Sequence, residues 1–204
     1  MPHPTGVFGL GEVMTNTHRF DAAARTWDDN PHRNALTVAF TGRLQELAGG
    51  VAGVRGLEIG CGTGNVGLVL APLMTSLAMV DSSAGMLEVL AEKIARLGIE
   101  NICVVQGDIL TAPMDGLAFD LAYTLMALHH VPDVPALLDR LAGCLRPGGR
   151  LCIGDLYPED GSFHGDAHPD VHRGFDPAEL GCVLADHGFD IESVEPMQIG
   201  RAHV

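Results

Sequence analysis

The stretch that decides the fold is Leu57-Glu58-Ile59-Gly60-Cys61-Gly62-Thr63-Gly64. Its apolar start is typical of a buried strand, and glycines at three alternate positions then let the chain turn tightly into a helix. Such a strand-to-helix turn in an open α/β sheet leaves room for a mononucleotide-like ligand to lie against the backbone. The stretch therefore predicts a ligand site at the carboxyl end of a central strand.

Two side chains of this segment argue against a dinucleotide ligand. Asn65 stands where the dehydrogenase fingerprint has its third glycine, and Glu58 places a carboxylate where phosphates would lie. The ligand is therefore expected to be neutral or cationic here. The segment resembles the first motif of the class I S-adenosylmethionine-dependent methyltransferases, an acidic residue followed by Gly-x-Gly-x-Gly. The resemblance implies a Rossmann-like fold and S-adenosylmethionine as the cofactor.

A second acidic residue, Asp81, ends the short apolar run Leu77-Ala78-Met79-Val80. It lies roughly 20 residues after the glycine loop, where a βαβ unit places an acid that binds ribose hydroxyls. The alternative is that Asp81 caps the following helix, a role that Ser82 or Ser83 could share. Beside Glu58 and the glycines, the ribose role is the favoured one.

A third apolar run, Ile102 to Val105, is followed by Gln106-Gly107-Asp108-Ile109. In the methyltransferase family the acid at this place accepts a hydrogen bond from the adenine amino group, and the next residue packs on the ring. Asp108 and Ile109 match those positions. The alternative is an Asp turn after a strand, which is common.

The fourth signal is the strand-like run Phe119 to Thr124, followed by the loop Leu125 to Val131. It resembles the family's fourth strand and the loop that touches the methionine end of the cofactor. Four signals in this order and spacing predict one cofactor site. The residues expected to bind the cofactor are Glu58, Gly60, Cys61, Gly62, Gly64, Asp81, Ser82, Met86, Asp108, Ile109 and Thr124.

The composition restricts the classes of partner. The chain has 204 residues, 47% of them hydrophobic, which suits one α/β domain with a substantial core. A net charge of −14 disfavours nucleic acid as a partner. Without a long apolar span or leader, no membrane span and a cytoplasmic location are expected. The five cysteines are scattered, so disulfides and zinc are not expected.

Strands and helices alternate over residues 20–197, the pattern of a single domain with a doubly wound, mostly parallel α/β sheet and helices on both faces. Helices are expected over 34–47, 84–97 and 135–145, and after an N-cap at Asp176. By resemblance, residues 20–50 form a helical lid over the cofactor, with Trp27 as its aromatic contact or as a core residue. Residues 1–19 are interpreted as a flexible leader, in which Met14 is an alternative start.

The end of the chain differs from the family pattern. The family fold closes with an antiparallel seventh strand, and no residues remain for it after an expected sixth strand over 190–196. Residues 199–204 are also what a common sequencing adapter encodes in one frame. We therefore interpret residues 198–204 as an artefactual tail and expect the seventh strand to be missing; a natural short tail is the alternative.

Two histidines, His129 and His130, follow the fourth strand at the carboxyl edge of the sheet and are the candidate catalytic bases. The family often carries histidine here without that role. Three further histidines between 164 and 172 have a four-residue spacing that could place them on one helix face. Pro169 argues against a regular helix, so no metal site is expected.

These patterns predict an enzyme that transfers a methyl group from S-adenosylmethionine to a small molecule, by in-line attack in a site that excludes water. The resemblance is nearest to the ubiquinone- and menaquinone-biosynthesis-like branch. One alternative is a module that binds the cofactor without turnover. A second is a nicotinamide-dependent oxidoreductase on a similar sheet, which Glu58 and Asn65 disfavour. The acceptor and the oligomeric state are not indicated by the sequence.

Overall fold

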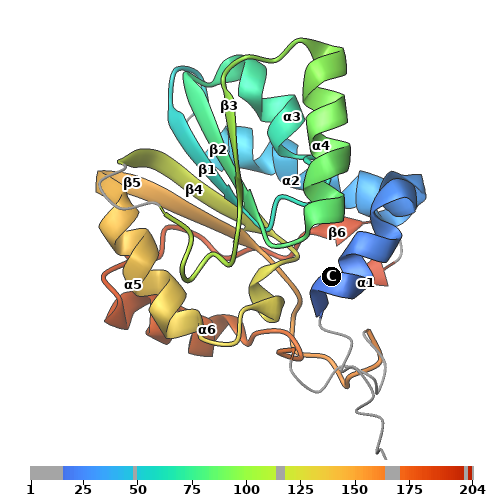
Figure 1. The fold of residues 1–204 in the computed structure, drawn as a ribbon. Coiled ribbons are helices and arrows are strands. Elements are labelled where there is room, and N and C mark those ends of the chain that lie inside the picture. The colour runs from blue at the N-terminus through green and yellow to red at the C-terminus, as the bar shows by residue number, and fades with distance from the viewer. Residues whose placement is uncertain (1–15, 48–49, 114–117, 164–170, 200–201, 204) are drawn as a thin grey trace, which may run out of the picture.

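The computed structural model of the chain describes residues 16–47, 50–113, 118–163, 171–199 and 202–203. Five strands form one sheet in the order β3-β2-β1-β4-β5, and every neighbouring pair is parallel (Figure 1). The strands are β1 (Arg55–Ile59), β2 (Ser76–Asp81), β3 (Ile102–Gln106), β4 (Phe119–Leu125) and β5 (Leu145–Gly154).

The most apolar strands lie in the middle of the sheet. β1 is buried from Gly56 to Ile59 and pairs with β2 on one side and with β4 on the other. The strand order reverses beside β1, because β2 and β3 run outward on one side while β4 and β5 run outward on the other. At such a switch point the loops after neighbouring strands diverge, and a ligand crevice opens at the carboxyl ends.

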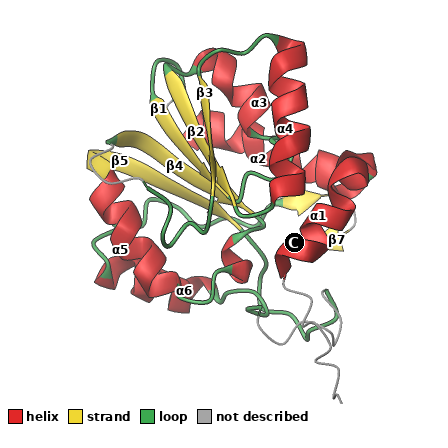
Figure 2. Cartoon of the chain, in the orientation of Figure 1, coloured by secondary structure: helices red, strands yellow, loops and turns green. Residues whose placement is uncertain are grey.

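Helices cover both faces of the sheet (Figure 2). One face carries α2 (Pro31–Leu47), α3 (Gly67–Leu70) and α4 (Ala84–Leu97), whose apolar side chains share one core cluster. The other face carries α5 (Val134–Cys144) and α6 (Pro177–Asp186), which share the second. Because strand side chains alternate, Leu57 and Ile59 pack toward α5 and α6. The short helices are α1 (Asn16–Ala23), η1 (Ala24–Asp29), η2 (Ala71–Leu73) and η3 (Leu128–His130).

The predicted helix over 84–97 is confirmed as α4. The hydroxyl of Ser83 caps it by accepting from the Met86 N–H at 3.2 Å, and it ends at Gly98, which has a φ of +65°. Helix α2 begins three residues before the predicted start. The Asn30 side chain accepts from the N–H of His32 at 2.9 Å, and Pro31 suits the first position of a helix.

The first described residues correct one expectation. Residues 16–19 belong to α1 instead of a flexible leader, and residues 1–15 lie outside the described part. Helix α1 packs against α4, where the Asp21 carboxylate accepts from the Ser83 hydroxyl at 2.6 Å and from the Gly85 N–H at 2.9 Å. These long-range contacts stabilise a helix that its own sequence does not predict.

The carboxyl-terminal part departs from the expected strands. β5 starts at Leu145, which pairs with Phe119, and its pairing with β4 resumes at Arg150 after an irregularity. The expected strand over 190–196 does not form; within the described residues no strand pairs with the outer edge of β5. β6 (Gln198–Ile199) and β7 (Ala202–His203) make a separate antiparallel pair instead. In the described part of the chain, no helix is long and apolar enough to cross a membrane.

Candidate functional site

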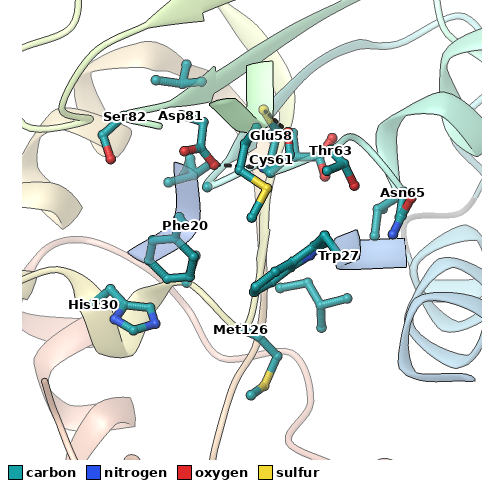
Figure 3. Close-up of a pocket in the computed structure, with 18 of the residues that line it drawn as sticks. Phe20, Trp27, Glu58, Cys61, Thr63, Asn65, Asp81, Ser82, Met126 and His130 are labelled. Carbon is teal, nitrogen blue, oxygen red and sulfur yellow. Dashed lines mark hydrogen bonds between the residues drawn. The ribbon is translucent and has the colours of Figure 1, made fainter. Parts of the chain in front are cut away.

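A cavity of about 880 Å³ lies at the carboxyl ends of β1, β2, β3 and β4, partly enclosed by α1, η1 and the start of α2. Figure 3 shows Glu58, Asp81 and Cys61 on one side and Phe20, Trp27, Met126 and His130 on the other. Nine of the eleven predicted cofactor residues line this cavity: Glu58, Gly60, Cys61, Gly62, Asp81, Ser82, Met86, Asp108 and Ile109.

The glycines after β1 have different surroundings. Gly60 has a φ of +65°, and a Cβ there would lie 2.3 Å from the Ala127 Cβ, because the loops after β1 and β4 touch. Gly62 has a φ of +52°, and its Cβ would meet only Met86 Sδ and Trp27 Nε1, both at 3.9 Å. Gly62 therefore borders open space, which suits a ligand lying against the backbone.

Two predicted cofactor residues do not line the cavity. A Cβ on Gly64 would lie 2.4 Å from Leu90 Cδ1, so this glycine permits close packing between the loop and α4. Thr124 is buried on β4, on the side of Ala122, which packs toward α5 and α6. Helix packing at Gly64 and strand alternation at Thr124 direct the side-chain positions of these two residues away from the cavity.

Glu58 is a buried acid on the α3 and α4 side of the sheet, with 4% of its surface exposed. Its carboxylate accepts from the Tyr123 hydroxyl at 3.3 Å and from the Gly67 N–H. Loss of hydration raises the pKa of Glu58 to about 8, so the group holds its proton at neutral pH. A cation bound beside it would favour the ionised form.

Asp81 connects two loops at the end of β2. One carboxylate oxygen accepts from the Gly62 N–H at 2.7 Å and the other from the Ser83 N–H at 2.9 Å. Burial raises the pKa of Asp81 above its usual value. Ser83, and not Asp81, supplies the side-chain cap of α4. Since each carboxylate oxygen has a second lone pair, Asp81 can also accept hydrogen bonds from a ligand.

Asp108 and Ile109 follow β3 at the same cavity. The Asp108 carboxylate accepts from the Leu110 N–H at 2.9 Å, which is the Asp turn considered as the alternative. The side chain is exposed and retains acceptor capacity, whereas Ile109 is buried. The turn and a ligand contact are therefore compatible at this position.

Asp28 attaches the amino-terminal segment to the glycine loop. Its carboxylate accepts from the Thr63 hydroxyl at 2.6 Å and from the Asn65 amide at 2.9 Å, and it lies 2.5 Å from Lys93 Nζ. Burial raises the pKa of Asp28, but the hydrogen bonds from Lys93, Thr63 and Asn65 outweigh this and lower it. Sequence reasoning missed this residue, because its partners are 35 or more positions away.

Aromatic rings form the opposite wall of the cavity (Figure 3). The Phe20 ring stands edge-to-face against Trp27 at 5.7 Å and against His130 at 5.2 Å between centroids. Trp27 lines the cavity, as the lid hypothesis requires. Met126 adds a strained backbone position with a φ of +55°, held by its N–H donating to the Gly154 carbonyl at 2.8 Å.

His129 forms a buried pair with Asp155 at the carboxyl end of β5. His129 Nδ1 lies 2.6 Å from Asp155 Oδ1, and the two side chains are 1% and 3% exposed. Both His129 and His130 line the cavity. Asp155 was not predicted as a site residue; an acid directly after the β5 run was the available signal.

The third histidine of the 164–172 series, His172, packs beside this pair. Its N–H donates to the His129 carbonyl at 2.9 Å, and its Nε2 lies 3.0 Å from the Val131 carbonyl oxygen. The other two histidines fall outside the described residues. Within the described ranges, no group of three or more His, Cys, Asp or Glu side chains is arranged to hold a metal ion.

Comparisons with known proteins agree with this geometry. A family model described as a methyltransferase domain matches residues 57–149. An uncharacterized methyltransferase of Schizosaccharomyces pombe is 32% identical over 144 residues, covering 63% of this chain and 51% of that protein. The 27-O-demethylrifamycin SV methyltransferase of Amycolatopsis mediterranei is 30% identical over 146 residues, covering 69% and 54%.

Among solved structures, the YcgJ protein of Bacillus subtilis superposes with a TM-score of 0.63 at 27% identity, covering 72% of this chain and 66% of that one. The chain spans about half the length of the curated relatives it matches. The Rossmann-like fold is confirmed. The solved structure of DhpI in a complex with S-adenosylmethionine has a similar fold, with a TM-score of 0.68 at 23% identity, covering 89% of this chain and 91% of that one. Residues 57–149 match a methyltransferase domain, and the chain has the class I fold of the S-adenosylmethionine-dependent methyltransferases.

Proposed function

We propose that this protein transfers a methyl group from S-adenosylmethionine to a small-molecule acceptor. One observation carries the proposal: the carboxyl ends of three neighbouring strands, β1, β2 and β3, bring Glu58, Gly62, Asp81 and Asp108 to the wall of a single cavity. When bound, the cofactor supplies an electrophilic methyl group on a sulfonium. The match of residues 57–149 to a methyltransferase domain supports both the cofactor and the reaction class.

The residues at the cavity fit this cofactor. Asp81 would accept hydrogen bonds from the ribose hydroxyls and Asp108 from the adenine amino group, with Ile109 and Met86 as apolar contacts. Glu58 would face the cationic end, where ligand charge would favour its ionised state. Cys61, Ser82 and the Gly60–Gly62 backbone complete the proposed contacts.

Methyl transfer depends mainly on orientation and on exclusion of water. The rings of Phe20, Trp27 and His130 shield the cavity, and the Asp28 hydrogen bonds hold this wall against the glycine loop. The amino-terminal segment thus covers the cavity with an apolar surface, and its hydrogen bonds keep it next to the glycine loop. This arrangement is the physical basis for the lid role that we assign to it.

We assign proton removal from the acceptor to His129, with Asp155 as its positioning residue and His130 as the alternative base. If His129 Nδ1 donates to Asp155, Nε2 is the nitrogen that accepts the proton. Asp155→Asn should then lower kcat about 100-fold, a typical general-base contribution, at unchanged affinity for S-adenosylmethionine. An unchanged kcat for a hydroxyl acceptor would remove His129 from this role.

The central test of the function combines binding and turnover. Calorimetry should show that the wild-type protein binds S-adenosylmethionine and not NADH, and labelled S-adenosylmethionine should transfer its methyl group within a panel of small metabolites. Binding without transfer to any acceptor would favour a cofactor-binding module. Failure to bind S-adenosylmethionine would overturn the proposal. A reducing compartment such as the cytoplasm is the proposed location, which is supported by five free cysteines.

A further inference from the structure

Two arginines of the cavity wall, Arg19 and Arg33, have no acidic partner among the described residues. The chain has 26 acidic and 12 basic residues. Among the described arginines, Arg25, Arg43, Arg146 and Arg150 form ion pairs with carboxylates. Arg25, on the same amino-terminal segment, pairs with two glutamates of α4. Within the described residues, neither Arg19 nor Arg33 forms an ion pair, although both line the cavity.

Each of the two guanidinium groups lies over the face of an aromatic ring. The Arg33 Cζ lies 3.7 Å from the centroid of the Trp27 ring, and the Arg19 Cζ lies 5.3 Å from that of Phe20. Arg33 Nη1 also donates to the Trp27 carbonyl at 3.4 Å. Stacking of this kind fixes the plane of a guanidinium and leaves most of its N–H donors at the edge. The guanidinium groups of Arg19 and Arg33 are therefore preorganised to bind a planar or tetrahedral anion.

The electrostatics of this wall favour an incoming negative charge. Burial lowers the pKa of Arg33, and the nearby charge of Arg19 lowers it further. Both effects show that the paired positive charges cost free energy in the absence of an anion. The acids of the cavity, Glu58, Asp81 and Asp108, are carried by a different set of elements, the strands and the loops that follow them. Arginines and acids are thus separated along the chain, with the arginines on α1 and α2.

We propose that Arg19 and Arg33 form an anion-binding subsite of the cavity, which takes a carboxylate or phosphate-type group of a bound small molecule. This inference rests on the proposed function, since that function defines which molecules enter the cavity. Two of them can carry the anionic group: the cofactor, through its carboxylate, or the methyl acceptor. The experiment below separates these two sources.

Neutral variants of matched shape provide the test. Arg33→Met and Arg19→Met remove the charge and the donors, while an unbranched side chain can still contact the aromatic ring. Arg25→Met is the control, because it removes an arginine from the same segment whose side chain is exposed and does not line the cavity. Circular dichroism and thermal denaturation establish that all three variants fold.

The first arm measures the affinity of each protein for S-adenosylmethionine and for decarboxylated S-adenosylmethionine, which differs by the carboxylate alone. If the cofactor brings the anion, Arg33→Met weakens binding of S-adenosylmethionine by about 10- to 100-fold, the range for a hydrogen bond to a charged group. Binding of the decarboxylated form stays unchanged. Arg25→Met binds both compounds as wild type does.

The second arm uses protein saturated with S-adenosylhomocysteine and titrates benzoate, benzamide and inorganic phosphate. If the acceptor brings the anion, wild type binds benzoate or phosphate, both cavity variants bind it at least about tenfold more weakly, and binding of neutral benzamide is unaffected. If both variants bind S-adenosylmethionine, benzoate and phosphate as tightly as wild type does, the proposed subsite is wrong, while the proposed function is unaffected. Wild-type protein without affinity for S-adenosylmethionine would instead overturn the proposed function.

Discussion

Replacing Glu58 by glutamine removes a titrating group from the interior while keeping its shape and its acceptor oxygen. In the folded protein, burial raises the pKa of Glu58 from an ordinary 4.5 to about 8. The unfolded chain releases this proton near pH 4.5, whereas the folded protein retains it up to about pH 8. The neutral carboxyl group therefore supports the fold fully below pH 4.5, and this contribution is lost as the pH rises toward 8.

The size of the effect follows from the shift. A difference of about 3.5 pKa units corresponds to about 5 kcal/mol of unfolding free energy between the two ends of this window, at about 1.4 kcal/mol per unit. At pH 7 roughly 3 kcal/mol of this is already lost. That amount is large beside the total stability of an ordinary domain, about 5–15 kcal/mol.

The assay is urea denaturation of wild type and Glu58→Gln at pH 5, 6, 7 and 8, followed by circular dichroism. All other titrating groups are shared, so their contributions cancel in the difference between the two proteins. We expect the stability of Glu58→Gln relative to wild type to increase steadily with pH up to about 8. A difference that stays constant across this range would refute the reasoning, because it would mean that Glu58 is ionised in the folded protein.

Two further substitutions test the glycine loop and the acid after β2. Gly60→Ala should destabilise the fold by about 2–5 kcal/mol in thermal denaturation, because the added methyl group meets Ala127 and the backbone has a positive φ. Gly42→Ala is the control and should cost no stability, because a Cβ at this position of α2 meets no other atom. Asp81→Ala should weaken S-adenosylmethionine binding by about 1–3 kcal/mol in calorimetry, and Asp81→Asn by less, because the amide keeps one acceptor. Unchanged affinity in a folded Asp81→Ala protein would exclude the ribose contact.

Local patterns made much of the fold predictable. The helix over 84–97 is predictable from its sequence, because the Ser83 cap, the apolar stripe and Gly98 all lie within or beside it. The parallel α/β sheet followed from the alternation of apolar runs and helices. The strand expected over 190–196 did not form, since a strand needs a hydrogen-bonded neighbour that local sequence cannot supply.

The site divides in the same way. The sequence by itself determined the glycine turn and the acids Glu58, Asp81 and Asp108, because parallel strands deliver the residues that follow them to one edge of the sheet. Only the tertiary structure decided that Thr124 faces α5 and α6 and that Asp28 forms hydrogen bonds with the glycine loop. It also decided that the Phe20 ring contacts His130 at the cavity. The sequence carries the periodicity of each element, whereas the contacts between distant elements depend on how they pack.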